Sequence, residues 1–350
     1  MRAAHVEDVP APSLNDFTVA CICPLGVECA ANAYTFGRLG KHYVVVAVMP
    51  QIGNNAAATT ATQVLNDFPS LRFGLLVGIG GGVPVEPDPD VHDEAISQKR
   101  DVRLGDVVVS ESTDVFGGVV QFDLGKHLAE GNFQRTDHLN KPPRVLSANL
   151  KRLDSQHRRV GSQIVAHVEE MLRRYPIMRR EYQHPGAQQD RLFRAEYVHR
   201  SGVTCKDCDE GHIVPRRIRS DKHPQIHYGT IGSSNAVVKD AKTRDVLRKD
   251  MDIMCVEMEA TGLMDTFPCL VIRGICDYAD SHKNKRWQPY AAATAAAYMK
   301  ELLMMIPPQQ VKESAKAEEL MEAGQSYSTL ASGYFESLSL RSGYVLKSLG

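Results

Sequence analysis

Carboxylates stand where two apolar runs of this sequence end. The stretch VEMEATG, residues 256–262, places Glu257 and Glu259 just after one such run, and VIRGICDYAD places Arg273 and Asp277 at the end of another. A buried carboxylate is costly unless something hydrogen-bonds to it. These acids therefore either have structural partners, such as the start of a helix whose dipole favours an acid, or they face a polar ligand.

An acid and a run of glycines follow two further apolar runs. Glu28 comes after the first run, and VGIGGGVP, residues 77–84, follows another. A glycine turn after a strand exposes backbone N–H groups that could hold an anion or a sugar hydroxyl, although it can also be a plain turn. It is not a P-loop, because no GK[ST] follows, and it is not a dinucleotide fingerprint, because counting from Gly78 the third glycine position is Val83.

Strand and helix patterns alternate along the chain. Strands are predicted within residues 17–23, 43–50, 73–84 (ending in a glycine turn), 101–112, 226–238 and 268–280, and helices after the turn at Pro24 up to residue 36 and within residues 54–68, 146–175, 256–267 and 291–306. This alternation predicts an α/β fold with a mostly parallel or mixed sheet. Ligands of open α/β sheets bind at the carboxyl ends of the strands, so we expect the acids and the glycines to meet at one site.

Composition bounds the class of protein. With 350 residues, 43% of them hydrophobic, and a net charge of −1, the chain can bury one large core or two modest ones, and it lacks the basic excess of a nucleic-acid binder. We find neither a signal peptide nor a charge-free apolar run that could span a bilayer. The eight scattered cysteines fit reduced thiols. These features predict a cytoplasmic protein with no nucleic-acid or membrane partner.

Taken together, the motifs resemble a known family. VEMEATG, VIRGICDYAD, the VGIGGGV run with LGDVVVS downstream, and CPLGVECA are similar to the nucleoside phosphorylase/nucleosidase superfamily of the purine and uridine phosphorylase type. The likeness is greatest to its fungal branch, in which segments like ADSHKNK and RWQPYAA follow the catalytic aspartate. It runs from about Phe17 to Ile306.

The resemblance implies a fold and a domain plan. We expect a three-layer α/β/α arrangement around a central mixed, partly barrel-like sheet. A catalytic domain over residues 14–306 would carry a basic insertion at about 181–228, and residues 307–350 would form a C-terminal helix and a serine-rich tail. The family also implies no cofactor, a purine nucleoside or nucleotide as the small-molecule partner, and a homodimer or higher homo-oligomer.

The resemblance also implies roles for single residues. Glu259 would accept hydrogen bonds from the ribose 2′ and 3′ hydroxyls, which suits a carboxylate because it offers only acceptor sites. Met258 would pack against the sugar, and Glu257 would have a structural role. Asp277 would protonate or hydrogen-bond purine N7 as the base leaves. Further substrate contacts are expected from Gly80, Gly81, Asn235 and Val237.

Two positions favour hydrolysis over phosphorolysis. Family phosphorylases bind phosphate with arginines at places that here read Glu28 and Leu76. Each charged hydrogen bond to phosphate contributes about 1.5–3 kcal/mol, so phosphate binding should be weak. Family nucleosidases use a glutamate at the Glu28 position to activate water, which Arg273 would help to hold. The alternatives are a phosphate-dependent purine nucleoside phosphorylase, an ATP-nucleosidase-like enzyme and a non-catalytic domain of an immune-like receptor.

The insertion contains a possible metal-binding pattern. Cys205 and Cys208 form a CxxC pair, and His199 and His212 lie nearby. Four such ligands could hold zinc, but a single CxxC without a second spaced pair is a weak signal. The sequence alone therefore favours a plain loop without metal.

The insertion also carries a basic cluster that includes Arg216, Arg217 and Arg219. Such a cluster is usually solvated surface. If it folds over the pocket, a bidentate arginine could hold a 5′-phosphate, and the substrate would be a nucleotide such as IMP, GMP, AMP or ATP rather than a free nucleoside.

Overall fold

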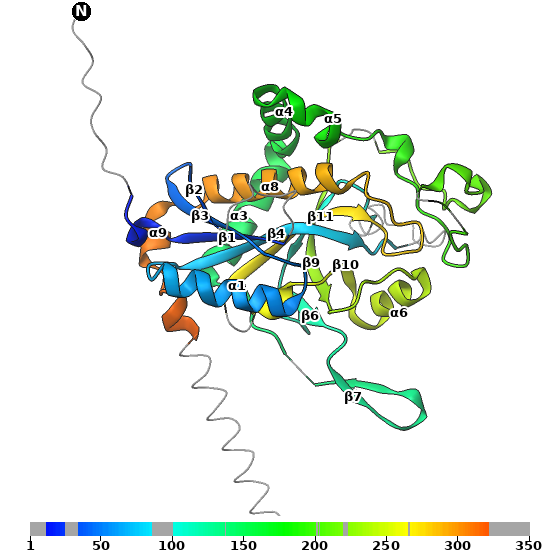
Figure 1. The fold of residues 1–350 in the computed structure, drawn as a ribbon, viewed down its shortest axis with the longest axis horizontal. Helices are drawn as coiled ribbons and strands as arrows, with labels where there is room; N and C mark the ends of the chain where they lie inside the picture. Colours follow the sequence, from blue (N-terminus) through cyan, green and yellow to red (C-terminus); the bar gives the residue numbers. More distant parts are fainter. Residues whose placement is uncertain are drawn as a thin grey trace, which may run out of the picture.

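The computed structural model describes residues 12–24, 34–85, 101–136, 138–200, 202, 204–219, 223–264 and 267–321. Glu28 lies outside these residues. The main sheet contains β1 (Val19–Cys23), β2 (Tyr34–Leu39), β3 (His42–Val48), β4 (Phe73–Gly82), β5 (Val107–Ser110), β6 (Val119–Gln121), β9 (Ile226–Ser233), β10 (Ile253–Glu257) and β11 (Cys269–Asp277). A separate hairpin, β7 (Gly125–His127) and β8 (Phe133–Arg135), projects from the body of the molecule (Figure 1).

Part of the sheet closes on itself. The strand order is β10-β9-β5-β11-β4-β1-β3-β2, and β10 also pairs with β4, so that β4, β11, β5, β9 and β10 form a ring. β4 is parallel to β1 and β11, whereas β5 is antiparallel to β11 and β10 is antiparallel to β4. The prediction of a mixed, partly barrel-like sheet is confirmed.

Helices cover both faces of the sheet (Figure 1). Their bounds are α1 Asn54–Asp67, α3 Arg144–Val160, α4 Ile164–Arg174, α5 Arg179–Tyr182, α6 Ala241–Met251, α7 Ala260–Met264, α8 Gln288–Met305 and α9 Pro308–Glu313. One core cluster joins α8, α3 and α4 to the sheet, and a second joins α1 and α7 to the opposite face. This is the predicted three-layer arrangement.

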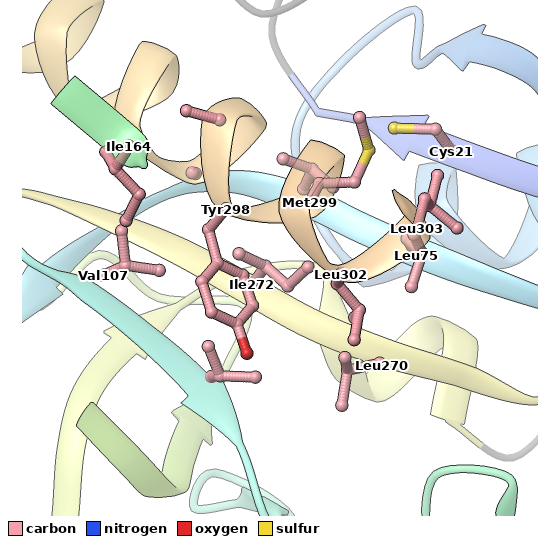
Figure 2. Packing of buried hydrophobic residues seen from close by; sticks show 14 of the residues in the cluster. Cys21, Leu75, Val107, Ile164, Leu270, Ile272, Tyr298, Met299, Leu302 and Leu303 are labelled. Atoms are coloured by element: carbon pink, nitrogen blue, oxygen red, sulfur yellow. The ribbon is translucent and has the colours of Figure 1, made fainter. Parts of the chain in front are cut away.

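β11 shows why the strands read as continuous apolar runs. Successive side chains point to opposite faces of a sheet. Leu270 and Ile272 belong to the core under α8, whereas Cys269 and Val271 belong to the core under α1. Figure 2 shows Leu302 of α8 packed over the sheet beside residues of β11. A strand that is covered on both faces needs apolar residues at nearly every position.

Two predicted helices differ from the structure. Residues 34–36 were expected to be helical, but Tyr34–Leu39 is β2, because its aromatic and β-branched residues pair antiparallel with β3. The long helix expected at 146–175 is two helices, α3 and α4. Gly161 separates them with φ at 79°, a left-handed backbone that favours glycine and stops a helix.

The packed part of the chain continues beyond the predicted boundary at Ile306. α9 follows directly. Val311 is buried in the core cluster under α8, and Ala317 is buried in the core cluster under α1. The N–H of Ala317 donates to the Leu71 carbonyl at 2.8 Å. None of the helices within the described ranges is long and apolar enough to cross a membrane.

The insertion at 181–228 has little regular structure before β9 begins. Short turns of helix alternate with extended segments, and a single bridge joins Phe193 to Ile213. Leu192 and Val214 are buried with Tyr278, the residue after Asp277. The insertion is therefore packed against the exit of β11, where the acids of the sequence motif lie.

Candidate active site

Strand ends from β4, β10 and β11 line one cavity. Its volume is about 290 Å³, near the lower end of the range for small-molecule sites. The lining residues are Pro24, Ile52, Ile79, Gly80, Gly81, Ala236, Val237, Val238, Val256, Glu257, Met258, Glu259, Arg273, Cys276, Asp277, Lys283, Lys285 and Gln288. The acids and glycines that stand far apart in the sequence thus meet at one place, as expected.

Arg273 joins the two glutamates of the VEMEATG motif. Its guanidinium is almost wholly buried, and one nitrogen, Nη2, makes a short ion pair with Glu257 and lies 3.1 Å from Oε2 of Glu259. A buried charge is tolerated only where it is paired and hydrogen-bonded. Arg273 therefore allows two carboxylates to lie side by side in the cavity wall.

Glu257 and Glu259 have different remaining partners. Oε2 of Glu257 accepts the backbone N–H groups of Glu259 at 3.0 Å and of Ala260 at 2.9 Å, which start α7. This is the helix-start role that the sequence allowed. Glu259 accepts the N–H of Gly53 at 3.2 Å through its other oxygen. Burial raises the pKa of Glu259 above its usual value, the charge of Arg273 opposes that rise, and the charge of Glu257 adds to it.

Asp277 lines the same cavity from the end of β11. Its side chain is buried, and Oδ1 accepts the N–H of Ala279 at 2.9 Å. Oδ2 lies 3.3 Å from Nζ of Lys283 and 3.1 Å from Sγ of Cys276. Ala279 has φ at 52°, an uncommon backbone conformation for a residue with a side chain. Strained backbone of this kind clusters at functional sites.

The glycine run belongs to β4 and is not the predicted turn. Gly78 pairs with Arg273 and Gly81 with Asp277 across the sheet. A Cβ at Gly78 would lie 2.2 Å from Nη1 of Arg273, and one at Gly81 would lie 2.9 Å from Oδ1 of Asp277. The glycines are needed because the charged side chains of β11 lie directly over this strand. Their N–H groups are in a sheet rather than in an exposed anion-binding turn.

The other predicted substrate contacts divide into two groups. Met258, Val237, Gly80 and Gly81 line the cavity. Asn235 does not. It is exposed, and its N–H donates to Oδ2 of Asp123 at 2.8 Å.

Two lysines at the cavity were not predicted. Lys283 and Lys285 both line it, from the segment that follows β11. The signal was present in the sequence as two cations within eight residues of Asp277. It was obscured because a lysine near an aspartate is common on any surface.

Arg216 and Arg219 form ion pairs with acidic residues that do not line this cavity. Arg216 pairs with Asp190 at 2.9 Å, and Arg219 contacts Asp106 through two nitrogens at 2.6 and 2.7 Å. Together with Arg217 they line a different cavity, of about 500 Å³. Among the described residues, the two cavities share no lining residue. The arginines thus do not fold over the site that contains Glu259.

Three of the four possible metal ligands come together. Ligand atoms of His199, Cys205 and Cys208 all lie within 4.8 Å of one another. His212 is not part of this group. Its ring stacks on Tyr197, with 4.3 Å between the ring centroids.

The sequence model of the phosphorylase superfamily matches residues 23–304, which include every described residue that lines this cavity. The chain belongs to the phosphorylase superfamily. A relative is described as a nucleotide-binding leucine-rich repeat (NLR)-like protein from Hyaloscypha variabilis, with 43% identity over 281 residues. The match covers 80% of this superfamily member but only 26% of the relative, so the chain spans about a quarter of that protein's length.

The chain is also similar to solved structures, at lower sequence identity. A 5′-methylthioadenosine/S-adenosylhomocysteine nucleosidase from Neisseria meningitidis, in complex with methylthio-immucillin-A, is 16% identical with a TM-score of 0.49. The match covers 82% of this chain and 98% of that one. The futalosine hydrolase of Helicobacter pylori is also 16% identical, with a TM-score of 0.47, and the match covers 83% and 99% of the two chains.

Proposed function

We propose that this protein hydrolyses the N-glycosidic bond of a purine nucleoside or nucleotide, giving the free base and ribose or ribose 5-phosphate. The observation that carries the proposal is the meeting of Glu259, Met258 and Asp277 in one cavity, with Arg273 holding the first of them in place. A hydroxyl acceptor and a proton donor that line the same cavity match the sugar and the base of a nucleoside.

The sugar would lie against Glu259 and Met258. An ionised carboxylate offers only acceptor sites, so Glu259 can receive both the 2′ and the 3′ hydroxyl. As the glycosidic bond lengthens, positive charge develops on the sugar ring, as in other glycoside cleavages. The carboxylates of Glu257 and Glu259 favour that charge, although Arg273 partly balances them in the resting site.

The base would lie against Asp277. When the C1′–N9 bond breaks, its electron pair goes to the purine, and a proton from Asp277 at N7 neutralises the charge. Lys283, 3.3 Å from Oδ2 of Asp277, adds a cation beside the departing base. A water oxygen then bonds to C1′ and loses a proton, and we assign Glu28 to receive it.

Hydrolysis rather than phosphorolysis is supported by the small number of arginines among the described residues that line the cavity. Leu76, at a place where family phosphorylases carry an arginine, is fully buried within β4. Among the described lining residues, Arg273 is the single guanidinium, and it is paired with two carboxylates. A phosphate ion beside Glu257 and Glu259 would be repelled.

The deciding experiment measures free purine released from a panel of nucleosides and 5′-nucleotides, including IMP, GMP, AMP and ATP, with and without phosphate. We expect base release without phosphate, and incorporation of solvent oxygen into the ribose. Release that requires phosphate and yields ribose 1-phosphate would instead establish a phosphorylase.

The NLR-like relative supports a second candidate, a sensing domain that binds a nucleotide and is part of a larger receptor. In that case the wild-type protein should bind a member of the panel in calorimetry and release no base from it. The intact Glu259 and Asp277 favour the enzyme.

A further inference from the structure

A cluster of thiols and imidazoles in the insertion takes no part in the proposed reaction. Cys205 and Cys208 lie at the start and just after the end of a short 3-10 turn, and neither is in a disulfide. Their sulfurs and a ring nitrogen of His199 lie within 4.8 Å of one another. Two thiols and an imidazole converging in this way are the donor set of a structural zinc site.

His282 supplies a second, independent observation. It is 7% exposed, and its Nε2 is a buried atom without a hydrogen-bond partner within the described chain. Buried polar atoms are nearly always satisfied, and an ion is one explanation for an exception. The His282 ring lies edge-on to His199, with 5.5 Å between centroids, and its carbonyl oxygen is 3.6 Å from Sγ of Cys205.

The surroundings of both histidines resemble those of metal ligands. Nδ1 of His282 lies 3.7 Å from Oδ2 of Asp280, and Nε2 of His199 lies 3.2 Å from the Thr204 carbonyl oxygen. A metal-bound histidine commonly donates its other ring N–H to a carboxylate or a carbonyl, which fixes the ring and the tautomer.

We propose that His199, Cys205, Cys208 and His282 bind a structural zinc ion. The first three already converge, and a shift of the His282 ring brings in the fourth ligand. His212, which the sequence spacing offered instead, is 47% exposed at its side chain and faces Asp209 at 3.7 Å. The site is closed by four protein ligands, so its role is structural rather than catalytic.

The metal would link the insertion to residues 282–285, which include two lysines that line the cavity. The N–H of His199 already donates to Oγ of Ser281 at 2.9 Å. The next residues are His282 and Lys283, and Lys283 reaches Asp277. Zinc binding at this place therefore holds the exit of β11 without touching the substrate, and it does not depend on the proposed reaction.

Elemental analysis of the full chain, purified without added metal, tests the proposal. We expect about one zinc per chain, lost in Cys205→Ser, Cys208→Ser and His282→Asn. His212→Asn is the matched imidazole control and Cys269→Ser the matched thiol control, and both should keep the metal. Removing zinc from the wild type should lower its Tm, and adding zinc back should restore it.

Cobalt substitution keeps the test valid if a cysteine variant fails to fold. Co²⁺ added to the metal-free wild type should give thiolate charge-transfer and tetrahedral d–d absorption bands. Absence of both zinc and these bands, or a Cys205–Cys208 disulfide in the protein as purified, overturns the site. Full zinc content in His282→Asn, or equal loss in His212→Asn, overturns the assignment of the fourth ligand.

Discussion

The guanidinium of Arg273, on β11, forms a buried ion pair with Glu257 at the end of β10, and the same nitrogen lies 3.1 Å from Glu259. One guanidinium thus forms ion pairs with two glutamates that differ in their other contacts. Glu257 accepts the N–H groups that begin α7, whereas Glu259 borders the cavity. The two roles can be separated by mutation.

Glutamine at each position should give opposite results. Glu257→Gln removes one partner of a buried ion pair, which typically costs about 3–5 kcal/mol of folding stability, so we expect a clearly lower Tm. Glu259→Gln puts an amide where the sugar hydroxyls need an acceptor, so we expect turnover to fall with a smaller change in Tm. Thermal unfolding and base release are measured on both variants. Wild-type turnover in Glu259→Gln would remove its role in binding the sugar.

Asp277→Asn should slow base release by at least about 100-fold, because it keeps the shape of the side chain and removes the proton. The measurement is turnover on the best substrate of the panel, with Asp114→Asn at an exposed position as the control. Near-normal turnover of Asp277→Asn would contradict its role as the acid.

Arg216→Gln and Arg219→Gln should lower Tm and leave the preference between a nucleoside and its 5′-monophosphate unchanged. Both arginines are held in ion pairs with Asp190 and Asp106 rather than at the cavity. The ratio of kcat/KM for the two substrates is the relevant measurement. If either variant raised KM about 10-fold for the monophosphate alone, the arginine would be a 5′-phosphate ligand after all.

The strand ends were predictable because their signal is local. A buried strand is a run of apolar residues, and Glu257, Glu259 and Asp277 interrupt such runs. The glycine run predicts a turn but lies in β4, because a turn and a close approach of a side chain both require glycine. What requires glycine at Gly78 is the guanidinium of Arg273, which lies almost 200 positions later in the sequence.

The contacts of the insertion were not predictable for a similar reason. The CxxC spacing is local, and the structure places the sulfurs of Cys205 and Cys208 close together. The approach of His282, and the pairing of Arg219 with Asp106, depend on how an irregular segment packs against distant strands. No short-range pattern encodes such contacts.

Two truncations test where the folded domain ends. A chain that stops at Ile306 loses α9 together with buried Val311 and Ala317, whereas a chain that stops at Met321 retains them. We expect the shorter chain to have the lower Tm, since a buried valine contributes about 1.5–3 kcal/mol. Equal Tm values for the two chains would show that the folded domain ends at Ile306, as the sequence predicts.

Acid should weaken the fold partly through Asp106. This buried carboxylate accepts hydrogen bonds from Arg219, from Nε2 of His227 at 2.9 Å and from the N–H of Gln225 at 2.9 Å. Burial alone would raise its pKa, but the hydrogen bonds and charges of Arg219 and His227 lower it from 3.8 to about 2. A lowered pKa in the folded state means that the carboxylate stabilises the protein above its unfolded pKa. That contribution, about 2 kcal/mol, is lost as pH falls through the interval between the two pKa values.

Asp106→Asn isolates this contribution, because asparagine has the same shape and does not titrate. The variant should have a lower Tm than the wild type at neutral pH, and the difference should be constant down to about pH 5. Below that it should narrow towards about pH 3, as the wild type alone loses a charge that Arg219 and His227 stabilise. Melting curves of both proteins across this range measure the difference. A deficit that stayed constant at every pH would show that Asp106 contributes through its hydrogen-bond geometry and not through its charge.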